Sequence, residues 1–551
     1  IGSELTSLYN TYTQSGSYIS DDIFQIVQTS VVISVQTQPG QYANALALLT
    51  TPDYGMEQVV GSAANNVISG IFPVENLLSL NELPDLLVSA SPIYSALGNS
   101  GLVESQGDKA LRSDISRDVF NVNGTGIKVG VLSDSYNTIL GNPAADDVIK
   151  GDLPGVDNPD FPNPVEVLAE YPFGTRSDEG RAMLQIVHDV APGADLAFRT
   201  GFLGPVDFAQ GIHEMQQAGC DVIVDDVTYI SEPFFRDGVV AQAVDSVTSL
   251  GVSYFTAAGN FGTHSWQGSF NPTAAPDGIS GEANNFAADE GGVDIYQNIS
   301  LYQGQYTVVL QWDDGTPGNT TNSDFDIYLA NEDGTTLFGF NRNNTGGAPL
   351  EVLPFTVAAD SAQSNFIIVR SSGTGPAQLK YIVYRGNLVI NEYDSPGAST
   401  ITGQANAEGA NAVGAVLFSN TPEYSGSVPT IASFSSRGGT PVNGVFRYKP
   451  DFCAPNGVNT SVDLGGVNFD NDEFPNFFGT SAAAPHAAGM AALILQARQK
   501  FYGDTLSPAL LKGIMQNTAY DMGTPGYDPA SGAGFLLADS ALKSLANPSP
   551  H

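Results

Sequence analysis

Hydrophobic residues between positions 127 and 262 form short continuous runs, and amphipathic segments separate these runs. A continuous apolar run that ends in a polar turn is typical of a strand buried in a parallel sheet. Strands that alternate with helices predict such a sheet with helices on both faces. The expected strands include 127–135, 220–230 and 252–260, the expected helices include 205–219 and 239–251, and 178–198 holds a helix, a turn and a strand.

A different pattern occupies residues 285–395. Apolar and polar residues alternate there with a period of two, turns recur at regular spacing, and no helical segment intervenes. Short strands at such spacing predict a β-sandwich of jelly-roll type. Because the α/β pattern resumes after this segment, we expect the sandwich to be inserted within the α/β domain.

The first 100 residues show strand-like runs at 31–37 and 66–74 with a helical segment at 41–50 between them. A β-α-β-β-α-β order of this kind predicts a small sheet with helices on one face. The pattern therefore divides the chain into an α+β unit, a linker, an α/β domain in two parts and an inserted sandwich. Their boundaries are 1–100, 101–126, 127–284 with 396–546, and 285–395.

The chain carries 58 Asp and Glu against 20 Lys and Arg, which gives a formal net charge of −38. This charge argues against nucleic acid and anionic membranes as partners. It suits a protein that tolerates acid or salt or binds cations, and equally the plain solubility of a secreted protein. No apolar run is long enough to cross a bilayer. Since the sequence begins at Ile1 without Met or a signal peptide, we expect a processed, secreted protein.

The segment 478–490 holds the strongest candidate for chemistry, Ser481 within Gly-Thr-Ser-Ala-Ala-Ala-Pro. A serine at a helix N-terminus lies beside free backbone N–H groups and the positive end of the helix dipole. Those groups can stabilise the oxyanion that forms when a hydroxyl attacks a carbonyl. Pro485 fits the first turns of such a helix. The alternative is a structural Ala/Gly-rich helix with no catalytic role.

Six segments in order resemble subtilisin-like serine peptidases (subtilases) over about 110–262 and 396–546. They are the strand ending at Asp134, then 190–194, 257–260, 433–438, 449–455 and 479–489. The resemblance implies a subtilisin-like fold, a peptide or protein substrate, Ser481 as nucleophile, Asp134 as the triad aspartate and Asn260 as the oxyanion residue. It also implies that residues 1–100 are a ferredoxin-like propeptide that binds the rest of the chain. The predicted sandwich is similar to accessory domains of secreted bacterial peptidases.

The sequence departs from subtilases at the position of the catalytic histidine, where Glu179 stands. A carboxylate is a weak base at neutral pH but is well matched to acidic pH. Sedolisins, acid-acting relatives of subtilisins, use a Ser-Glu-Asp arrangement of this kind. They carry an aspartate four residues after the glutamate, where this chain has Met183, and an oxyanion aspartate where it has Asn260.

A second carboxylate is available on the strand 220–227, where Asp225 and Asp226 are adjacent. Two acids on a buried strand are costly unless they are paired or functional. Because side chains alternate along a strand, only one of them faces the site. The resemblance to the subtilase strand beside the substrate cleft implies that this one is Asp226. Asp134, Glu179 and Asp226 would then share protons, because close like charges do not all ionise. Asp178 is either a further member or a plain helix N-cap.

Two functions follow. The first is a secreted, acid-adapted serine endopeptidase with a Ser-Glu-Asp centre. The second is a catalytically impaired pseudo-peptidase that binds peptide or protein partners. Retention of Ser481 and Asn260 favours the first, and a propeptide-like unit still attached favours the second.

Family resemblance places substrate contacts on the strands that follow Asp226 and precede Asn260, where a peptide would add as an extra strand. The expected substrate-binding residues are Thr228, Tyr229, Ala257, Ala258 and Gly259. Acidic loops in the predicted sandwich could supply oxygen ligands to structural Ca²⁺, although solvated loops are the simpler interpretation. The candidate ligands are Asp313, Asp314, Asp324 and Asp326.

Overall fold

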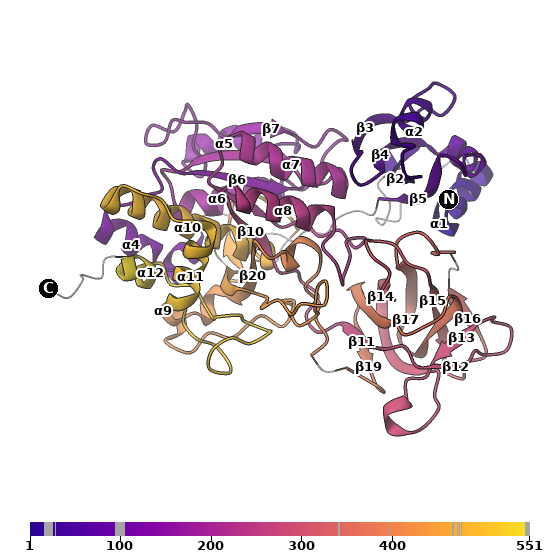
Figure 1. Cartoon of the computed structure of the whole chain (residues 1–551). Helices are drawn as coiled ribbons and strands as arrows, with labels where there is room; N and C mark the ends of the chain where they lie inside the picture. Colours follow the sequence, from indigo (N-terminus) through magenta and orange to yellow (C-terminus); the bar gives the residue numbers. More distant parts are fainter. Residues whose placement is uncertain are drawn as a thin grey trace.

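The computed structural model describes residues 1–15, 26–27, 29–93, 105–339, 342–395, 397–465, 468–470, 472, 474 and 476–545. Parts of the predicted units 1–100, 101–126 and 396–546 lie outside these residues. The chain forms an α/β unit, against which an N-terminal unit and an antiparallel sheet are packed (Figure 1).

A seven-stranded parallel sheet forms the centre of the α/β unit, in the order β21-β20-β10-β9-β6-β8-β7. Nearly every residue of its central strands is buried, as expected for a sheet that is covered on both faces. This confirms the predicted mixed α/β fold. The strands are β6 (Lys128–Ser133), β7 (Glu166–Ala169), β8 (Asp195–Thr200), β9 (Val222–Asp225), β10 (Ser253–Ala257), β20 (Ala410–Leu417) and β21 (Phe452–Asn456).

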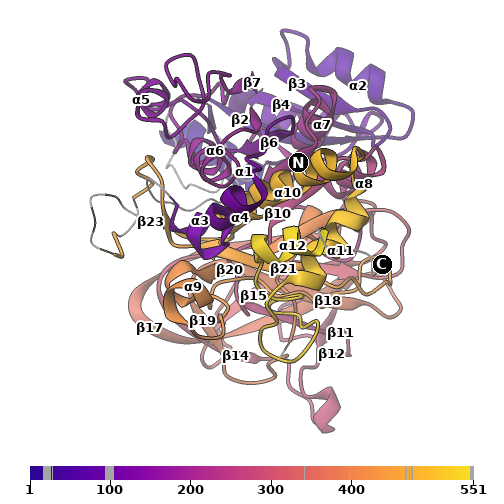
Figure 2. The ribbon, with the colours of Figure 1, turned by 90° about the vertical axis from the view of Figure 1, so that its left-hand side faces the viewer.

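Two apolar cores lie on the two faces of this sheet. The long helix α10 packs with α6 over one face, and α7 and α8 pack over the other. Figure 2 shows α10 running along the sheet beside β10. The helices of the unit are α3 (Gln106–Ala110), α4 (Ser113–Phe120), α5 (Pro143–Lys150), α6 (Glu179–Val190), α7 (Pro205–Gln217), α8 (Val239–Ser249), α9 (Pro422–Ser425), α10 (Thr480–Tyr502), α11 (Pro508–Thr518) and α12 (Ala538–Leu545), with a short ribbon of β22 (Val458–Asn459) and β23 (Asn476–Phe477).

The N-terminal unit is a five-stranded antiparallel sheet with helices against it. Val32, Ile71 and Ile93 extend from this unit into the apolar core that α7 and α8 form on the parallel sheet. An ion pair of 3.8 Å between Glu4 and Arg342 also joins it to the antiparallel sheet unit. Its elements are α1 (Ser3–Ser15), β1 (Ile26–Val27), β2 (Ser30–Thr37), α2 (Tyr42–Leu49), β3 (Glu57–Ser62), β4 (Val67–Pro73), the 3-10 helix Val74–Glu82 and β5 (Leu87–Pro92).

A nine-stranded antiparallel sheet lies between β10 and β20 in the sequence. Its first three strands precede residue 285, so the expected boundary of the inserted segment falls after them. The long strands β14 and β17 pair along most of their length. The strands are β11 (Ser265–Ser269), β12 (Pro272–Ala274), β13 (Glu282–Asn284), β14 (Gln297–Asp313), β15 (Asp324–Asn331), β16 (Leu337–Gly339), β17 (Leu350–Ser372), β18 (Gln378–Arg385) and β19 (Leu388–Ile390).

No helix in the described part of the chain combines the length and apolar composition that a bilayer crossing requires.

Candidate active site

Three neighbouring strands of the parallel sheet end at one edge, and each end carries a predicted site residue. Asp134 follows β6, Asp226 follows β9, and Asn260 lies three residues beyond β10. The register aligns Leu132 on β6 with Asp225 on β9, so Asp134 and Asp226 emerge at nearly the same level. Open α/β sheets place ligand sites at this carboxyl edge. The sheet thus brings Asp134 together with Asp226 and Asn260, which lie 92 and 126 positions after it in the sequence.

Ser481 is the second residue of α10, and its side chain is buried at the start of that helix. Gly479 before it has a φ of 109°, a conformation that favours glycine, and a Cβ there would lie 3.0 Å from Asn260 Nδ2. Pro485 lies inside α10 as predicted. The serine therefore sits where the first backbone N–H groups of the helix have no intrahelical acceptor.

Asn260 faces this helix start and is held in one orientation by Thr480. Its Oδ1 accepts hydrogen bonds from the Thr480 backbone N–H (2.9 Å) and from the Thr480 hydroxyl (3.0 Å). Because the amide oxygen is engaged there, the amide nitrogen points the other way and keeps its two donors. Asn260 and Ser481 line the same cleft, so Asn260 can donate to an oxyanion formed in it.

Asp134 is buried and contacts the backbone at the start of α6. Its Oδ1 accepts the backbone N–H of Glu179 (2.9 Å), and its Oδ2 accepts the backbone N–H (2.9 Å) and hydroxyl (2.5 Å) of Ser177. Burial raises the pKa of Asp134, although the bonds from Ser177 oppose that shift. Asp134 therefore fixes where the Glu179 backbone lies.

The carboxyl of Glu179 contacts that of Asp226, and both side chains are buried. Neither Asp226 oxygen receives a well-formed hydrogen bond from an N–H or hydroxyl donor among the described residues, and its polar neighbours are the Glu179 carboxyl and the Ser133 hydroxyl. Burial raises the pKa of Asp226 to about 7, and the charge on Asp134 acts in the same direction. Two carboxyl groups can bond to each other only if one of them carries a proton.

The neighbouring Asp225 turns to the other side of the strand. Its Oδ1 accepts the backbone N–H of Val227 (3.0 Å) and the side-chain amide of Gln404 (2.9 Å). Burial raises its pKa to about 6. Of the two adjacent acids, Asp226 is the one that lines the cleft beside Ser481.

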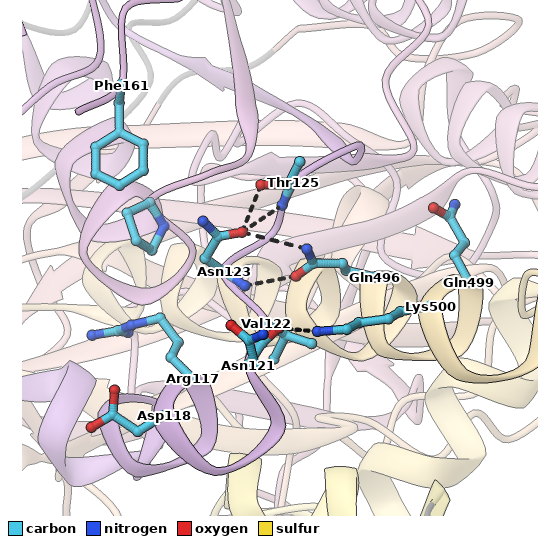
Figure 3. A pocket seen from close by; sticks show the side chains of 11 residues that line it. Arg117, Asp118, Asn121, Val122, Asn123, Thr125, Phe161, Gln496, Gln499 and Lys500 are labelled. Atoms are coloured by element: carbon cyan, nitrogen blue, oxygen red, sulfur yellow. Dashed lines mark hydrogen bonds between the residues drawn. The ribbon is translucent and has the colours of Figure 1, made fainter. Parts of the chain in front are cut away.

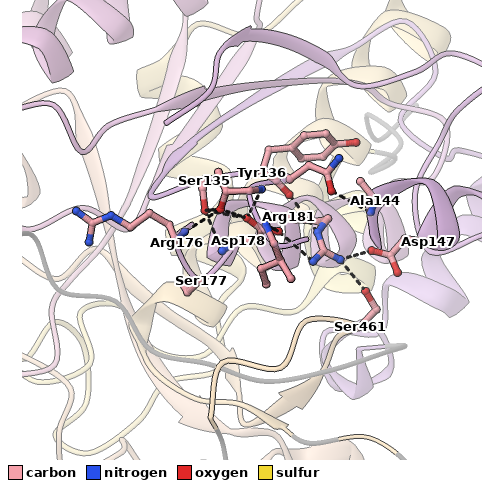
Figure 4. A network of polar contacts seen from close by, with 12 residues as sticks. Ser135, Tyr136, Ala144, Asp147, Arg176, Ser177, Asp178, Arg181 and Ser461 are labelled. Atoms are coloured by element: carbon pink, nitrogen blue, oxygen red, sulfur yellow. Dashed lines mark hydrogen bonds and ion pairs between the residues drawn. The ribbon is translucent and has the colours of Figure 1, made fainter. Parts of the chain in front are cut away.

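A buried polar network anchors the start of α6 from behind (Figure 4). Asp178 adopts the left-handed conformation at the N-cap with a φ of 58°, which aspartate tolerates better than most residues. Its Oδ1 accepts the Ser135 hydroxyl (3.0 Å) and the backbone N–H of Thr138 (2.8 Å). Arg181 forms a buried ion pair with Asp147 and lies 3.3 Å from Asp178. Asp178 thus joins the turn after β6 to α6 and does not enter the cleft.

The cleft has a volume of about 290 Å³ and lies between the parallel sheet, α10 and the antiparallel sheet. Thr228, Ala257 and Gly259, three of the five expected substrate-binding residues, line it. The other two do not. The hydroxyl of Tyr229 donates to the Gly201 carbonyl (2.7 Å), and Ala258 packs in a separate apolar cluster, because side chains alternate in extended chain.

Sequence reasoning missed four residues that line the cleft, namely Phe261, Tyr384, Arg385 and Thr480. Phe261 and Thr480 adjoin predicted residues and could have been found by proximity. Tyr384 and Arg385 belong to β18 of the antiparallel sheet, and no sequence signal shows where that sheet packs.

None of the four histidines in the described residues lines the cleft. His188 packs edge-on against Phe161, and burial lowers its pKa to about 4. His486 belongs to α10, and its Nε2 lies 2.5 Å from the Ser105 hydroxyl. Burial lowers the pKa of His486 to about 4 as well. His551 lies outside the described residues.

A second, larger pocket of about 750 Å³ lies at the opposite, amino edge of the parallel sheet (Figure 3). Asn123 and Gln496 line it and bond to each other, so that its polar groups largely satisfy one another. No predicted site residue lies there.

The four candidate calcium ligands contact protein donors. Asp313 pairs with Arg236 (2.6 Å), and Asp314 accepts the hydroxyl of Thr321 (2.8 Å). Asp324 accepts the hydroxyl of Ser371 (2.7 Å), and burial raises the pKa of Asp326 to about 7. Within the described residues no group of three or more His, Cys, Asp or Glu is arranged to hold a metal ion. Calcium binding stays a prediction from the sequence.

Comparison with known proteins points to one family. Residues 335–534 match the model of the subtilase family, Peptidase S8. This range includes Ser481 but not Asp134, Glu179, Asp226 or Asn260. The Subtilisin-like protease SBT1.4 of Arabidopsis thaliana is 27% identical over 341 residues, which cover 55% of this chain and 39% of that protein. The Minor extracellular protease Vpr of Bacillus subtilis (strain 168) is 26% identical over 414 residues, which cover 70% and 48%.

The chain thus contains a subtilase-family match and has subtilisin-like homologues, although it spans less than half the length of these two curated relatives. The solved structure of the Clostridium perfringens CspB protease has a TM-score of 0.50 with 16% sequence identity, over 80% of this chain and 97% of that one. At that identity the similarity shows a shared fold.

Proposed function

We propose that this chain is a serine endopeptidase in which Ser481 is the nucleophile and the carboxyl pair Glu179–Asp226 moves the proton. One observation carries the proposal. The buried carboxyl groups of Glu179 and Asp226 lie together, and Asp226 lines the cleft that also holds Ser481 and Asn260. A carboxylate in such a pair can take the hydroxyl proton, and the resulting acid can return it.

The reaction would proceed as acyl transfer through two tetrahedral intermediates. The Ser481 Oγ attacks the peptide carbonyl while its proton passes to the Glu179 carboxylate. The Asn260 side-chain amide and backbone N–H groups at the start of α10 stabilise the oxyanion. The Glu179 acid then protonates the leaving amine. Water hydrolyses the acyl-enzyme by the same steps in reverse.

Asp134 acts in this scheme as a positioning residue. It accepts the backbone N–H of Glu179 and holds the start of α6, while Asp226 is the carboxyl that touches the Glu179 side chain. We therefore propose separate roles for the two aspartates, from which the sequence predicted one shared role: Asp134 positions the backbone of Glu179, and Asp226 contacts its carboxyl.

The shared proton makes acidic pH the working range. In the working state one carboxyl of the pair is ionised and acts as the base, and the other is protonated and donates a hydrogen bond to it. The pair therefore has to carry a single proton. Since the pKa of Asp226 is raised to about 7, the pair loses that last proton as the pH rises through neutrality. At strongly acidic pH both groups are protonated and the base is lost. We therefore expect a bell-shaped profile with its maximum below pH 6.

The decisive experiment combines turnover with covalent labelling of the nucleophile. The purified chain should digest a denatured protein at pH 4–6 and react with a fluorophosphonate probe at Ser481, located by peptide mass spectrometry. Ser481→Ala should lose both signals, whereas Ser540→Ala, a change in the C-terminal helix α12, should keep both. Absence of serine-dependent cleavage across pH 3–8, also after removal of the N-terminal unit, would reject the proposal.

We further propose that the N-terminal unit is an inhibitory partner that the enzyme releases. This proposal is supported by the apolar contact that Val32, Ile71 and Ile93 make with the core under α7. Incubation at pH 5 should release a fragment that ends before residue 127, measured by intact mass, in the wild type but not in Ser481→Ala. Secretion accords with the name of the extracellular Bacillus subtilis relative and with the acidic composition.

A pseudo-peptidase is the second candidate, because a carboxylate stands where subtilases carry an imidazole. On that alternative the wild type and Ser481→Ala would bind an unfolded peptide equally well, and neither would cleave it.

A further inference from the structure

The antiparallel sheet supplies one wall of the catalytic cleft. β18 ends at Tyr384 and Arg385, and both residues line the cleft together with Ser481. The Tyr384 ring packs edge-on against Phe261, with 4.7 Å between the ring centroids, and its hydroxyl lies 3.1 Å from that of Thr402. The end of β18 is therefore fixed to the α/β unit and is not a loose neighbour of it.

The turn after Arg385 is also fixed. Gly386 has a φ of 104°, and a Cβ at this position would lie 2.2 Å from the Tyr306 ring. Arg385 itself is half-buried, and its Nη1 donates to Gln305 Oε1 on β14 (2.8 Å). A guanidinium has five N–H donors in a planar fork, so one such bond orients Arg385 and leaves donors for a ligand.

Arg385 pairs with no carboxylate among the described residues. Other arginines around the antiparallel sheet are neutralised, since Arg236 pairs with Asp313 and Arg370 pairs with Glu282. Arg176 and Arg437 also form no ion pair among the described residues, but neither of them lines the cleft. Because Arg385 lines the cleft, its positive charge is available to a ligand that binds there.

The remaining lining carries only one other ionisable carboxyl or basic group. That group is Asp226, which contacts Glu179. The rest of the lining is apolar or neutral, with Phe261, Ala257 and Thr228 among its members. A ligand carboxylate would thus meet a guanidinium in a partly desolvated cleft, where charge-assisted bonds are strong.

We propose that Arg385 makes the cleft select substrates that carry an aspartate or glutamate side chain next to the scissile bond. The inference rests on the proposed peptidase function and adds its substrate class. The specificity group comes from the inserted antiparallel sheet, outside the elements that hold Ser481, Glu179 and Asn260.

The test compares matched peptides that differ only by Glu, Gln or Lys, scanned over two positions on each side of the scissile bond at pH 5.5 and low salt. At one position the wild type should prefer Glu over Gln by roughly tenfold or more in kcat/KM, as charge-assisted hydrogen bonds predict. Arg385→Gln should bring the ratio to about one, and Arg385→Lys should restore part of it. Arg385→Glu should favour the Lys peptide. Arg437→Gln, which changes an arginine outside the cleft lining, should leave the Glu preference unchanged.

A binding measurement separates this inference from the proposed function. Fluorescence anisotropy on Ser481→Ala should give tighter binding of the Glu peptide than of the Gln peptide, and added Arg385→Gln should remove the difference. Equal affinities and equal kcat/KM values for the Glu and Gln peptides at every position would overturn the inference even if the enzyme cleaves. A Glu preference in binding without any cleavage would uphold the inference while rejecting the peptidase. Loss of the preference in Arg437→Gln as well would also overturn the assignment to Arg385.

Discussion

The carboxyl group of Asp226 contacts that of Glu179 at the point where β9 ends and α6 begins. Asp134, the other aspartate at this edge, bonds instead to the backbone N–H of Glu179. The two aspartates therefore act on different parts of one residue, its side chain and its backbone. Each part can be tested by a substitution that keeps the shape of the group.

Glu179→Gln should remove the base without changing the packing of the start of α6. We expect kcat to fall by about 10²–10⁴, the usual contribution of a general base. Steady-state kinetics at pH 5 measure the change, with KM expected to stay within a few fold. The melting temperature should stay close to that of the wild type. Retention of more than a tenth of the wild-type kcat would show that another group moves the proton.

Asp226→Asn should shift the alkaline side of the pH–rate profile. The wild type loses the shared proton near neutrality because burial raises the pKa of Asp226 to about 7, whereas the amide has no proton to lose there. The profile of kcat/KM against pH, from pH 3 to 9, reports the shift. Asp225→Asn is the matched control, because this neighbour bonds to Gln404 and does not touch Glu179. An unchanged alkaline limb in Asp226→Asn would remove the carboxyl pair from the mechanism.

Asn260→Asp should show whether the amide donates to the oxyanion. Aspartate keeps the oxygen that accepts from Thr480 but, when ionised, has no donor and repels an oxyanion. We expect kcat at pH 6.5 to fall by about 10²–10³, the range known for the loss of one oxyanion donor. The loss should be smaller at pH 4, where a protonated carboxyl donates again. Thr480→Val, which removes the hydroxyl bond to Asn260 Oδ1, should cost much less.

Gly180→Ala should destabilise the fold at the start of α6. A Cβ at residue 180 would lie 2.3 Å from the Phe198 ring and 2.8 Å from the Ser135 carbonyl oxygen. Overpacking of this kind typically costs about 1–3 kcal/mol in the free energy of unfolding. Gly513→Ala is the control, since no heavy atom lies within 4 Å of its Cβ position in α11, and there alanine should stabilise by about 0.5–1 kcal/mol. Urea unfolding at pH 5 compares the two.

The folded chain should become more stable as the pH falls from 7.5 to 5. Burial raises the pKa of Asp225 to about 6 and those of Asp226, Glu232 and Asp326 to about 7, and raises that of Glu351 as well. The folded chain binds these protons more tightly than the unfolded chain does. Their stabilisation is therefore complete below the unfolded pKa near 4 and is lost as the pH rises through 6–7.

Three histidines act against this trend, because burial lowers the pKa of His188 and His486 to about 4 and lowers that of His264 as well. Their contribution is lost as the pH falls below about 6.5, the ordinary histidine value. Five carboxyl groups against three imidazoles leave a net gain towards acid, which scanning calorimetry at pH 7.5, 6 and 5 measures. A melting temperature that falls steadily over this range would contradict the assignment of these carboxyls as protonated.

Much of the catalytic edge could be predicted because its residues follow buried strands. The continuous apolar run before Asp134 and the run before Asp225 and Asp226 mark strand ends, alternation turns only one of the two adjacent acids to the cleft, and the resemblance to subtilases points to Asp226. The helix beginning at Glu179 followed from its periodicity. These are local patterns, and the geometry of a parallel sheet places their ends together.

The other wall of the cleft could not be predicted. Tyr384 and Arg385 lie more than 95 residues before Ser481 in a strand whose alternating pattern shows only that one face is buried. Which face meets the α/β unit depends on contacts such as that of Tyr384 with Phe261. The separate tasks of Asp134 and Asp226 also depend on side-chain direction, which strand position alone does not fix.

Because the antiparallel sheet is inserted between β10 and β20, its strands are synthesised before the parallel sheet is complete. When β10 has just been synthesised, its neighbour β20 still lies about 150 residues further along the chain, and Ser481 is later still. Until then β10 is an open edge, the kind of surface that invites mispairing. The newly made antiparallel sheet can cover part of the open edge of β10 before β20 and β21 are synthesised. The nascent chain is thus without Ser481 until the described strands of both sheets have been made.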